Sequence, residues 1–144
     1  MLLLQNHIYK NLLFFGLSFI LVASTYAQNE ARNWYFGGQA GLDFSTSPPS
    51  LLTNGAMNVY EGCATISDAS GNLLFYSEGT TVWDKTQSVM ANGTGLLGGS
   101  SPSNGCIILK MPGSNNLYYI FTIPDILSGS NFRYNIIDLS LAAG

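Results

Sequence analysis

Short apolar stretches alternate along this chain with short clusters of turn-forming residues. In the clearest case, the segment DASGN at residues 68–72 connects the stretches CATIS and NLLFYS. Asp and Asn side chains hydrogen-bond nearby backbone groups and glycine tolerates a positive φ, so this segment predicts a hairpin turn. Asp68, Gly71 and Asn72 are its expected structural residues. A similar turn, PGSNN at residues 112–116, separates CIILKM from LYYIFTI.

The pattern repeats about every 40 residues. Asn33, Asn72 and Asn116 each precede a stretch rich in apolar and aromatic residues, and GCATI from Gly62 matches GCIIL from Gly105. These markers keep the same order along the chain, which indicates repeated structural units. The repeats span approximately residues 33–71, 72–115 and 116–144, and the third lacks counterparts of the later markers.

The composition favours strands over helices. Of all residues, 47% are hydrophobic and only 9% charged, and the chain holds 16 Gly, eight Tyr, eight Phe and two Trp. About four short strands in each repeat is typical of β-propeller blades, which must stack because one blade cannot cover both of its faces. The expected fold is all-β, an incomplete β-propeller of two full blade-like repeats and part of a third. A β-sandwich, which also uses many short strands, is the alternative.

Residues 1–27 differ from the rest and predict a signal peptide. An apolar core of about a dozen residues follows Lys10, and Thr25 and Ala27 are the small residues of a cleavage site. A membrane-spanning helix needs about 20 apolar residues, so this core is short for one, and no second long apolar run follows. We therefore expect a domain at residues 28–144 with no membrane span, secreted or exposed at the cell surface.

Cleavage would also change the available chemistry. It would remove His7, the only histidine, and leave four basic residues against eight acidic ones, a formal charge of −4. Without histidine the mature chain has no Ser-His-Asp triad, no Cys-His pair and no His-ligated zinc site. The scattered basic residues form no stripe that would bind a phosphate backbone, so nucleic acid is not an expected partner.

The segments EGCATISDASGNLLFY and PGSNNLYYIFT, with flanking parts of residues 33–141, resemble a known family. It is the amino-terminal region of large secreted PKD-domain proteins that end in a gliding-motility-associated, type IX secretion sorting domain. The resemblance implies a β-propeller-like head on a long surface protein, with no established catalytic residue to carry over. It also implies that this chain is a fragment, whose partners are the missing propeller blades and downstream domains.

Few residues are candidates for chemistry. Glu61, Asp68, Glu78 and Asp84 lie close in sequence and could supply paired carboxylates for glycoside hydrolysis, although turn capping explains them more simply. Asp68 and Asp84 are weak calcium candidates, and no other cofactor is expected. Cys63 and Cys106 hold matching repeat positions, which favours two free thiols over a disulfide.

The aromatic residues recur at matching repeat positions, so we expect most of them to pack between blades, with a carbohydrate-binding platform as the rival interpretation. Three functions remain open. The first is a non-catalytic binding or adhesion head of an exported bacterial surface protein, with an extracellular glycan or protein as ligand. The alternatives are a carbohydrate-active enzyme using paired carboxylates and a structural spacer.

Overall fold

A computed structural model describes residues 29–125 and 131–141, so the predicted signal peptide lies outside the described residues. The described part is all-β, as predicted, and its only helical element is a 3-10 turn, η1 (Asn29–Ala31). No helix within it is long and apolar enough to cross a lipid bilayer. The strands form three antiparallel sheets.

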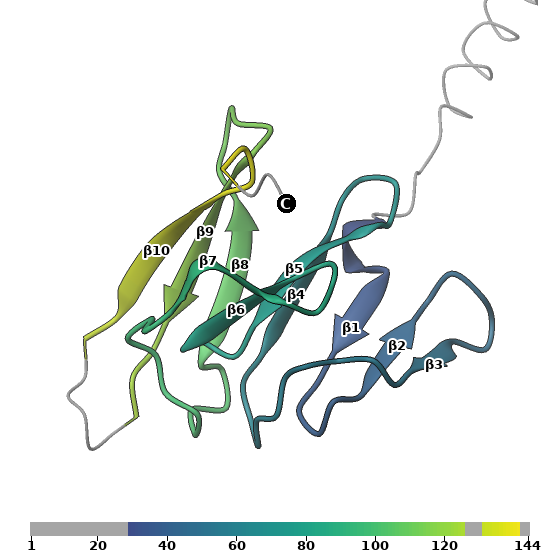
Figure 1. Cartoon of the computed structure of the whole chain (residues 1–144), viewed down its shortest axis with the longest axis horizontal. Helices are drawn as coiled ribbons and strands as arrows, with labels where there is room; N and C mark the ends of the chain where they lie inside the picture. The colour runs from purple at the N-terminus through teal and green to yellow at the C-terminus, as the bar shows by residue number, and fades with distance from the viewer. Residues whose placement is uncertain (1–28, 126–130, 142–144) are drawn as a thin grey trace, which may run out of the picture.

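Each sheet is a meander in which consecutive strands pair (Figure 1). The first sheet contains β1 (Asn33–Tyr35), β2 (Gly41–Asp43) and β3 (Ser50–Leu52). The second sheet contains β4 (Ala64–Ser67), β5 (Leu73–Ser77), β6 (Thr81–Asp84) and β7 (Val89–Thr94). The third sheet contains β8 (Cys106–Lys110), β9 (Leu117–Thr122) and β10 (Arg133–Asp138). Both predicted hairpins occur, between β4 and β5 and between β8 and β9.

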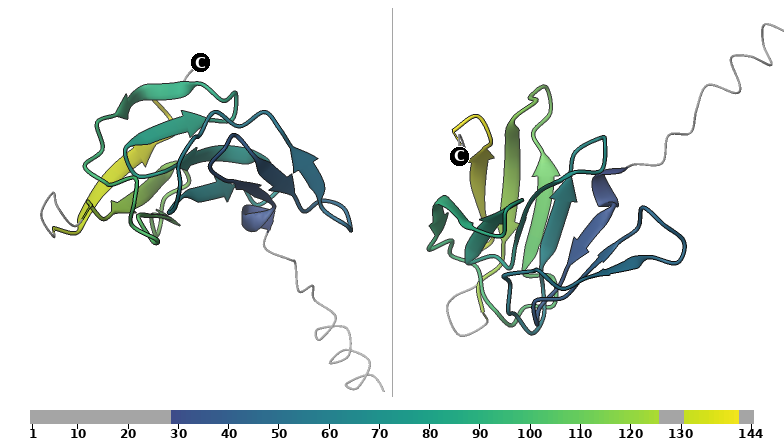
Figure 2. Two further views of the ribbon diagram at one scale, coloured as in Figure 1. Left: turned by 90° about the horizontal axis from the view of Figure 1, so that it is seen from below. Right: turned by 45° about the vertical axis from the view of Figure 1, so that its right-hand side comes forward.

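The second sheet lies between the other two and is covered on both faces (Figures 1 and 2). Tyr76 packs with Tyr35 of the first sheet in one core, and Phe75 packs with Ile120 of the third sheet in another. The leading strand β4 contacts both β1 and β8. This is the stacking that the blade prediction describes, although each interface taken alone resembles a two-sheet sandwich.

The sequence repeats do not coincide with the sheets. β5 and β9, which follow Asn72 and Asn116, are the second strands of their sheets, whereas β1, which follows Asn33, is the first strand of its own. Each repeat therefore joins strands of one sheet to the leading strand of the next. Among the described residues, the first sheet has no counterpart of β4 and β8, and the third has no counterpart of β7.

Side chains of β4 and of Cys63, just before it, cover part of the open edge of β1. The Tyr35 backbone N–H donates to Thr65 Oγ1 at 2.9 Å, and the Tyr35 carbonyl accepts from the Cys63 thiol at 3.5 Å. The Asn33 side chain also donates to the Gly71 carbonyl at 2.8 Å, which ties β1 to the hairpin of the second sheet. These bonds satisfy edge groups that a further strand would otherwise pair.

The glycines of the two GC markers allow neighbouring sheets to approach closely. A Cβ on Gly62 would collide with the backbone of Gly105 and Pro102, and the Gly62 N–H donates to the Pro102 carbonyl at 3.2 Å. Any larger residue at position 62 would push apart the segments that lead into β4 and β8. Close backbone approach therefore explains this part of the repeat.

Candidate functional site

The aspartates that end several strands stabilise turns. Asp43, Asp68, Asp84 and Asp138 each accept a backbone N–H from the residue two positions later, at 2.7 to 2.9 Å. In Asp68, the hydrogen bond from the Asn72 side chain is the main cause of a lowered pKa. Burial acts to raise the pKa of Asp84, but hydrogen bonds from Thr86 and Ser88 outweigh it and the pKa is lowered. Asp68 and Asp84 are therefore ionised at neutral pH, and all four carboxylates accept hydrogen bonds in their own turns.

The two candidate glutamates also accept hydrogen bonds, Glu78 within its own turn and Glu61 from a distant segment of the chain. Glu78, which is 8% exposed, accepts from the Thr80 hydroxyl and from the Thr81 backbone N–H. Glu61 accepts from the Ser103 hydroxyl at 3.2 Å. Within the described ranges, no group of three or more His, Cys, Asp or Glu side chains is placed to hold a metal ion.

The two cysteines are free and lie in different cores. Cys63 packs against the core between the first and second sheets, whereas Cys106 is part of the core between the second and third sheets. Burial raises the pKa of the Cys63 thiol, and it raises the pKa of Cys106 to about 12. Both thiols therefore stay protonated at neutral pH and are poor nucleophiles.

The predicted hairpin at residues 68–72 adopts the expected turn. Gly71 has a φ of +87°, and Asp68 Oδ1 accepts from the backbone N–H groups of Ser70 and Asn72 at 2.8 and 2.9 Å. The Asn29 side chain donates to the Ala69 carbonyl at 3.0 Å and holds η1 against this turn. The second hairpin turns at Gly113, which has a φ of +76°.

These two hairpins and η1 enclose a pocket of about 450 Å³, which we call the hairpin-end pocket. Polar and apolar side chains both line it. The polar lining residues are Glu30, Ser67, Asp68, Ser70, Lys110, Asn115 and Asn116. The apolar lining residues include Ile66, Leu74 and Leu139, together with the buried Tyr118.

The hairpin-end pocket combines both signs of charge with neutral hydrogen-bonding groups. Among the described residues, the one ion pair joins Arg32 and Asp43, outside the pocket. Lys110 therefore has no carboxylate of that part of the chain within ion-pairing distance. Burial, followed by the charges of Asp68 and Glu30, raises the pKa of Tyr118, so its hydroxyl remains a neutral donor and acceptor. The lining therefore offers lysine, amide and hydroxyl groups to a polar ligand, beside apolar side chains.

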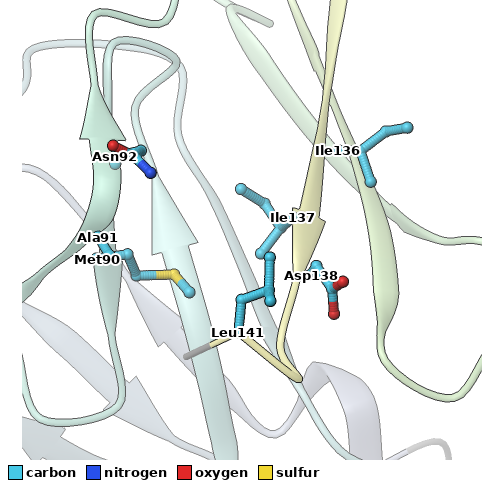
Figure 3. A pocket seen from close by; sticks show the side chains of 8 residues that line it. Met90, Ala91, Asn92, Ile136, Ile137, Asp138 and Leu141 are labelled. Atoms are coloured by element: carbon cyan, nitrogen blue, oxygen red, sulfur yellow. The ribbon is translucent and has the colours of Figure 1, made fainter. Parts of the chain in front are cut away.

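A second cavity of about 200 Å³ lies between β7 and β10. Figure 3 shows Ile137 and Leu141 directed toward Met90, whereas Ile136 points to the opposite side of its strand. Met90 and Ile137 also pack against the core between the second and third sheets. This cavity is a gap at the outer rim of an apolar interface, and it offers few polar groups to a ligand.

Of the residues that line the hairpin-end pocket, the sequence pattern singles out Asp68 as a turn residue and Asn116 as a repeat marker. It predicts residues 112–116 only as a turn, and it does not connect Lys110 or Glu30 to the first hairpin. Asn72 and Asn116 are matched repeat positions, so the turns beside them belong at the same end of neighbouring sheets. That correspondence was the available signal.

No protein-family model, curated protein or solved structure matches this chain.

Proposed function

We propose that this chain is a non-catalytic binding or adhesion head of an exported bacterial cell-surface protein, and that an extracellular glycan or protein binds in its hairpin-end pocket. The single observation behind the proposal is the composition of that pocket. Lys110 and the Asn115 and Asn116 amides line one volume of about 450 Å³, together with the carboxylates of Glu30 and Asp68. Amides and a lysine can hydrogen-bond the hydroxyl or carbonyl groups of a glycan or a peptide.

The state of the acidic residues supports binding over catalysis. A glycoside hydrolase needs two carboxyl groups about 5–10 Å apart, one of them with a raised pKa so that it can act as an acid. Asp68 and Asp84 have lowered pKa values and accept hydrogen bonds from their own turns. Both carboxyl groups are therefore deprotonated near neutral pH, so neither can donate a proton as a general acid.

The test is a glycan array probed with the secreted chain and with two lysine variants. Lys110→Ala removes the ammonium group from the hairpin-end pocket, whereas Lys85→Ala removes an exposed lysine on the turn between β6 and β7. We expect at least about tenfold weaker binding for Lys110→Ala and unchanged binding for Lys85→Ala, because a charge-assisted hydrogen bond contributes about 1.5–3 kcal/mol. Equal binding by both variants would contradict the pocket assignment.

Every glycan that binds is then incubated with the chain and its products are analysed. Binding without turnover supports the adhesion head. Turnover would favour a carbohydrate-active enzyme with paired carboxylates. If neither glycans nor extracellular matrix proteins bind, the structural spacer becomes the better interpretation.

A further inference from the structure

The outer face of the third sheet is apolar, and no other sheet within residues 29–125 and 131–141 packs against it. Its side chains form two rows across the three strands, because residues paired in register point to the same face. One row is Ile107, Phe121 and Tyr134, and the other is Leu109, Tyr119 and Ile136. Tyr134 is 62% exposed, and its ring contacts those of Phe121 and Tyr119 at centroid distances of 6.3 and 6.0 Å. We call these six residues the third-sheet outer face.

The outer face of the first sheet is apolar as well. Trp34, Leu42 and Leu51 are paired across β1, β2 and β3, so they form one row. The Trp34 ring also packs against Phe44 at a centroid distance of 4.8 Å, and Leu51 is 68% exposed. We call these four residues the first-sheet outer face. The first-sheet outer face includes no charged side chain. Beside the third-sheet outer face the only charged side chain in register, among the described residues, is Asp138, which pairs with Leu117 at the end of β10, whereas exposed surfaces of soluble proteins normally mix charges with apolar groups.

Matching repeat positions show whether each outer face corresponds to a face that packs against the preceding sheet or against the following sheet. Tyr76 and Ile120 lie four residues after Asn72 and Asn116, and each faces the sheet before its own. Phe75 lies three residues after Asn72 and faces the following sheet, and Tyr119 holds the matching place on the third-sheet outer face. The third-sheet outer face is therefore built to receive a following sheet.

The first-sheet outer face corresponds to a face that packs against a preceding sheet. Trp34 follows Asn33 as Leu73 follows Asn72, and Leu73 packs into the core toward the preceding sheet. At both contacts between neighbouring sheets, the face directed toward the following sheet packs against the face that the next sheet directs toward the preceding one. Among the described residues, the first-sheet and third-sheet outer faces are left without such a partner.

We infer that a second copy of this chain docks head to tail, with the third-sheet outer face of one copy against the first-sheet outer face of the other. Such an interface continues the stacking already present twice within each copy. It is heterologous, so two copies either close into a ring of six sheets or remain open for further copies to add. The inference does not depend on the proposed function, because neither face includes residues of the hairpin-end pocket.

The experiment measures the mass of the secreted chain in solution across a range of concentrations. Tyr134→Lys places a charge on the third-sheet outer face, and Leu51→Lys places one on the first-sheet outer face. Both side chains are more than 60% exposed, so the fold of a single copy should tolerate the change. Tyr60→Lys is the matched control, because Tyr60 is fully exposed and lies outside both faces.

We expect the unchanged chain and Tyr60→Lys to associate equally. Each face variant alone should need at least about tenfold more protein to associate, because an unpaired lysine would be buried in the interface. An equimolar mixture of Tyr134→Lys and Leu51→Lys should form two-copy particles and nothing larger, since one intact face of each kind remains in the mixture. Circular dichroism of each variant checks that the β-structure is retained.

Other outcomes would overturn the inference. One such outcome is that Leu51→Lys still associates, Tyr134→Lys does not, and mixing the two variants does not bring Tyr134→Lys into two-copy particles. The interface would then join the third-sheet outer faces of two copies. If the unchanged chain stays monomeric up to millimolar concentration, a second copy is not the occupant. In that case, if the two outer faces become buried in a longer chain that carries further sheets, the occupant is a sheet of the same chain.

Discussion

The core between the first and second sheets contains a hydrogen-bond network that can be broken by removing one oxygen atom. The Tyr76 hydroxyl accepts from the Ala56 backbone N–H at 2.9 Å and donates to Gln87 Oε1 at 2.6 Å. Gln87 Nε2 donates in turn to the Tyr35 hydroxyl at 3.3 Å. The Tyr76 ring is fully buried and lies between those of Tyr35 and Trp83, at centroid distances of 4.7 and 5.5 Å.

Tyr76→Phe keeps the ring stack and removes only the hydroxyl group. The Ala56 N–H then has no acceptor and Gln87 Oε1 loses a donor. A buried unpaired polar group costs about 1–3 kcal/mol, and Gln87 is half-buried, so water can partly compensate there. We therefore expect the free energy of unfolding to fall by about 1–2 kcal/mol and Tm to fall by about 4–8 °C in a domain of this size.

Thermal and urea melts followed by circular dichroism, at one protein concentration, measure the effect. Tyr60→Phe is the control, because the fully exposed Tyr60 side chain can exchange its hydroxyl hydrogen bonds with water and should melt like the unchanged chain. Tyr76→Ala should cost about 3–5 kcal/mol, because it also removes the ring from the stack. If Tyr76→Phe melts within about 1 °C of the unchanged chain, the hydroxyl network does not stabilise the contact between the two sheets.

Four further predictions follow from local chemistry. Gly71→Val should lower Tm by more than Ser70→Ala, because Gly71 has a φ of +87° and the Asp68 carboxylate binds the Ser70 backbone rather than its side chain; equal melting temperatures would contradict this. Asp84 has a lowered pKa in the folded state, so its ionised form stabilises the fold at a pH above its unfolded pKa of about 4. This stabilisation is lost as the pH falls through the lower pKa of the folded state. The difference in urea midpoint between the unchanged chain and Asp84→Asn should therefore shrink from pH 5 to pH 2. Cys106, with a pKa of about 12, should resist iodoacetamide at pH 8 until urea unfolds the chain, and rapid native labelling would show that the thiol is exposed. Amino-terminal sequencing of the secreted product should begin at Gln28, and a product that begins at Met1 would refute the signal-peptide prediction.

Much of the local structure could be predicted from the sequence. The turn at Asp68 and Gly71, the strands that flank it and the period near 40 all depend on residues close together in the chain, where turn chemistry and alternation act directly. The all-β class follows from these features and from the composition. Within the candidate site, the same local rules identified Asp68 as a turn residue, and its hydrogen bonds in the structure are those of a turn.

The hairpin-end pocket depended on tertiary structure. Lys110 lies more than 40 residues beyond Asp68, and the two line one pocket only because β4 and β8 are neighbours in the stack. A repeat is cyclic, so its period does not say at which strand a sheet begins; hydrogen-bond pairing made β4 and β8, rather than β5 and β9, the leading strands.

The same distinction applies to the aromatic residues. The sequence predicted that most would pack between blades, and Tyr35, Phe75, Tyr76 and Tyr118 do so. Trp34 occupies a comparable position in the pattern, yet it is 46% exposed because no sheet precedes the first one in the described structure. Alternation along a strand determines which face a side chain joins, whereas burial of that face depends on whether another sheet packs against it.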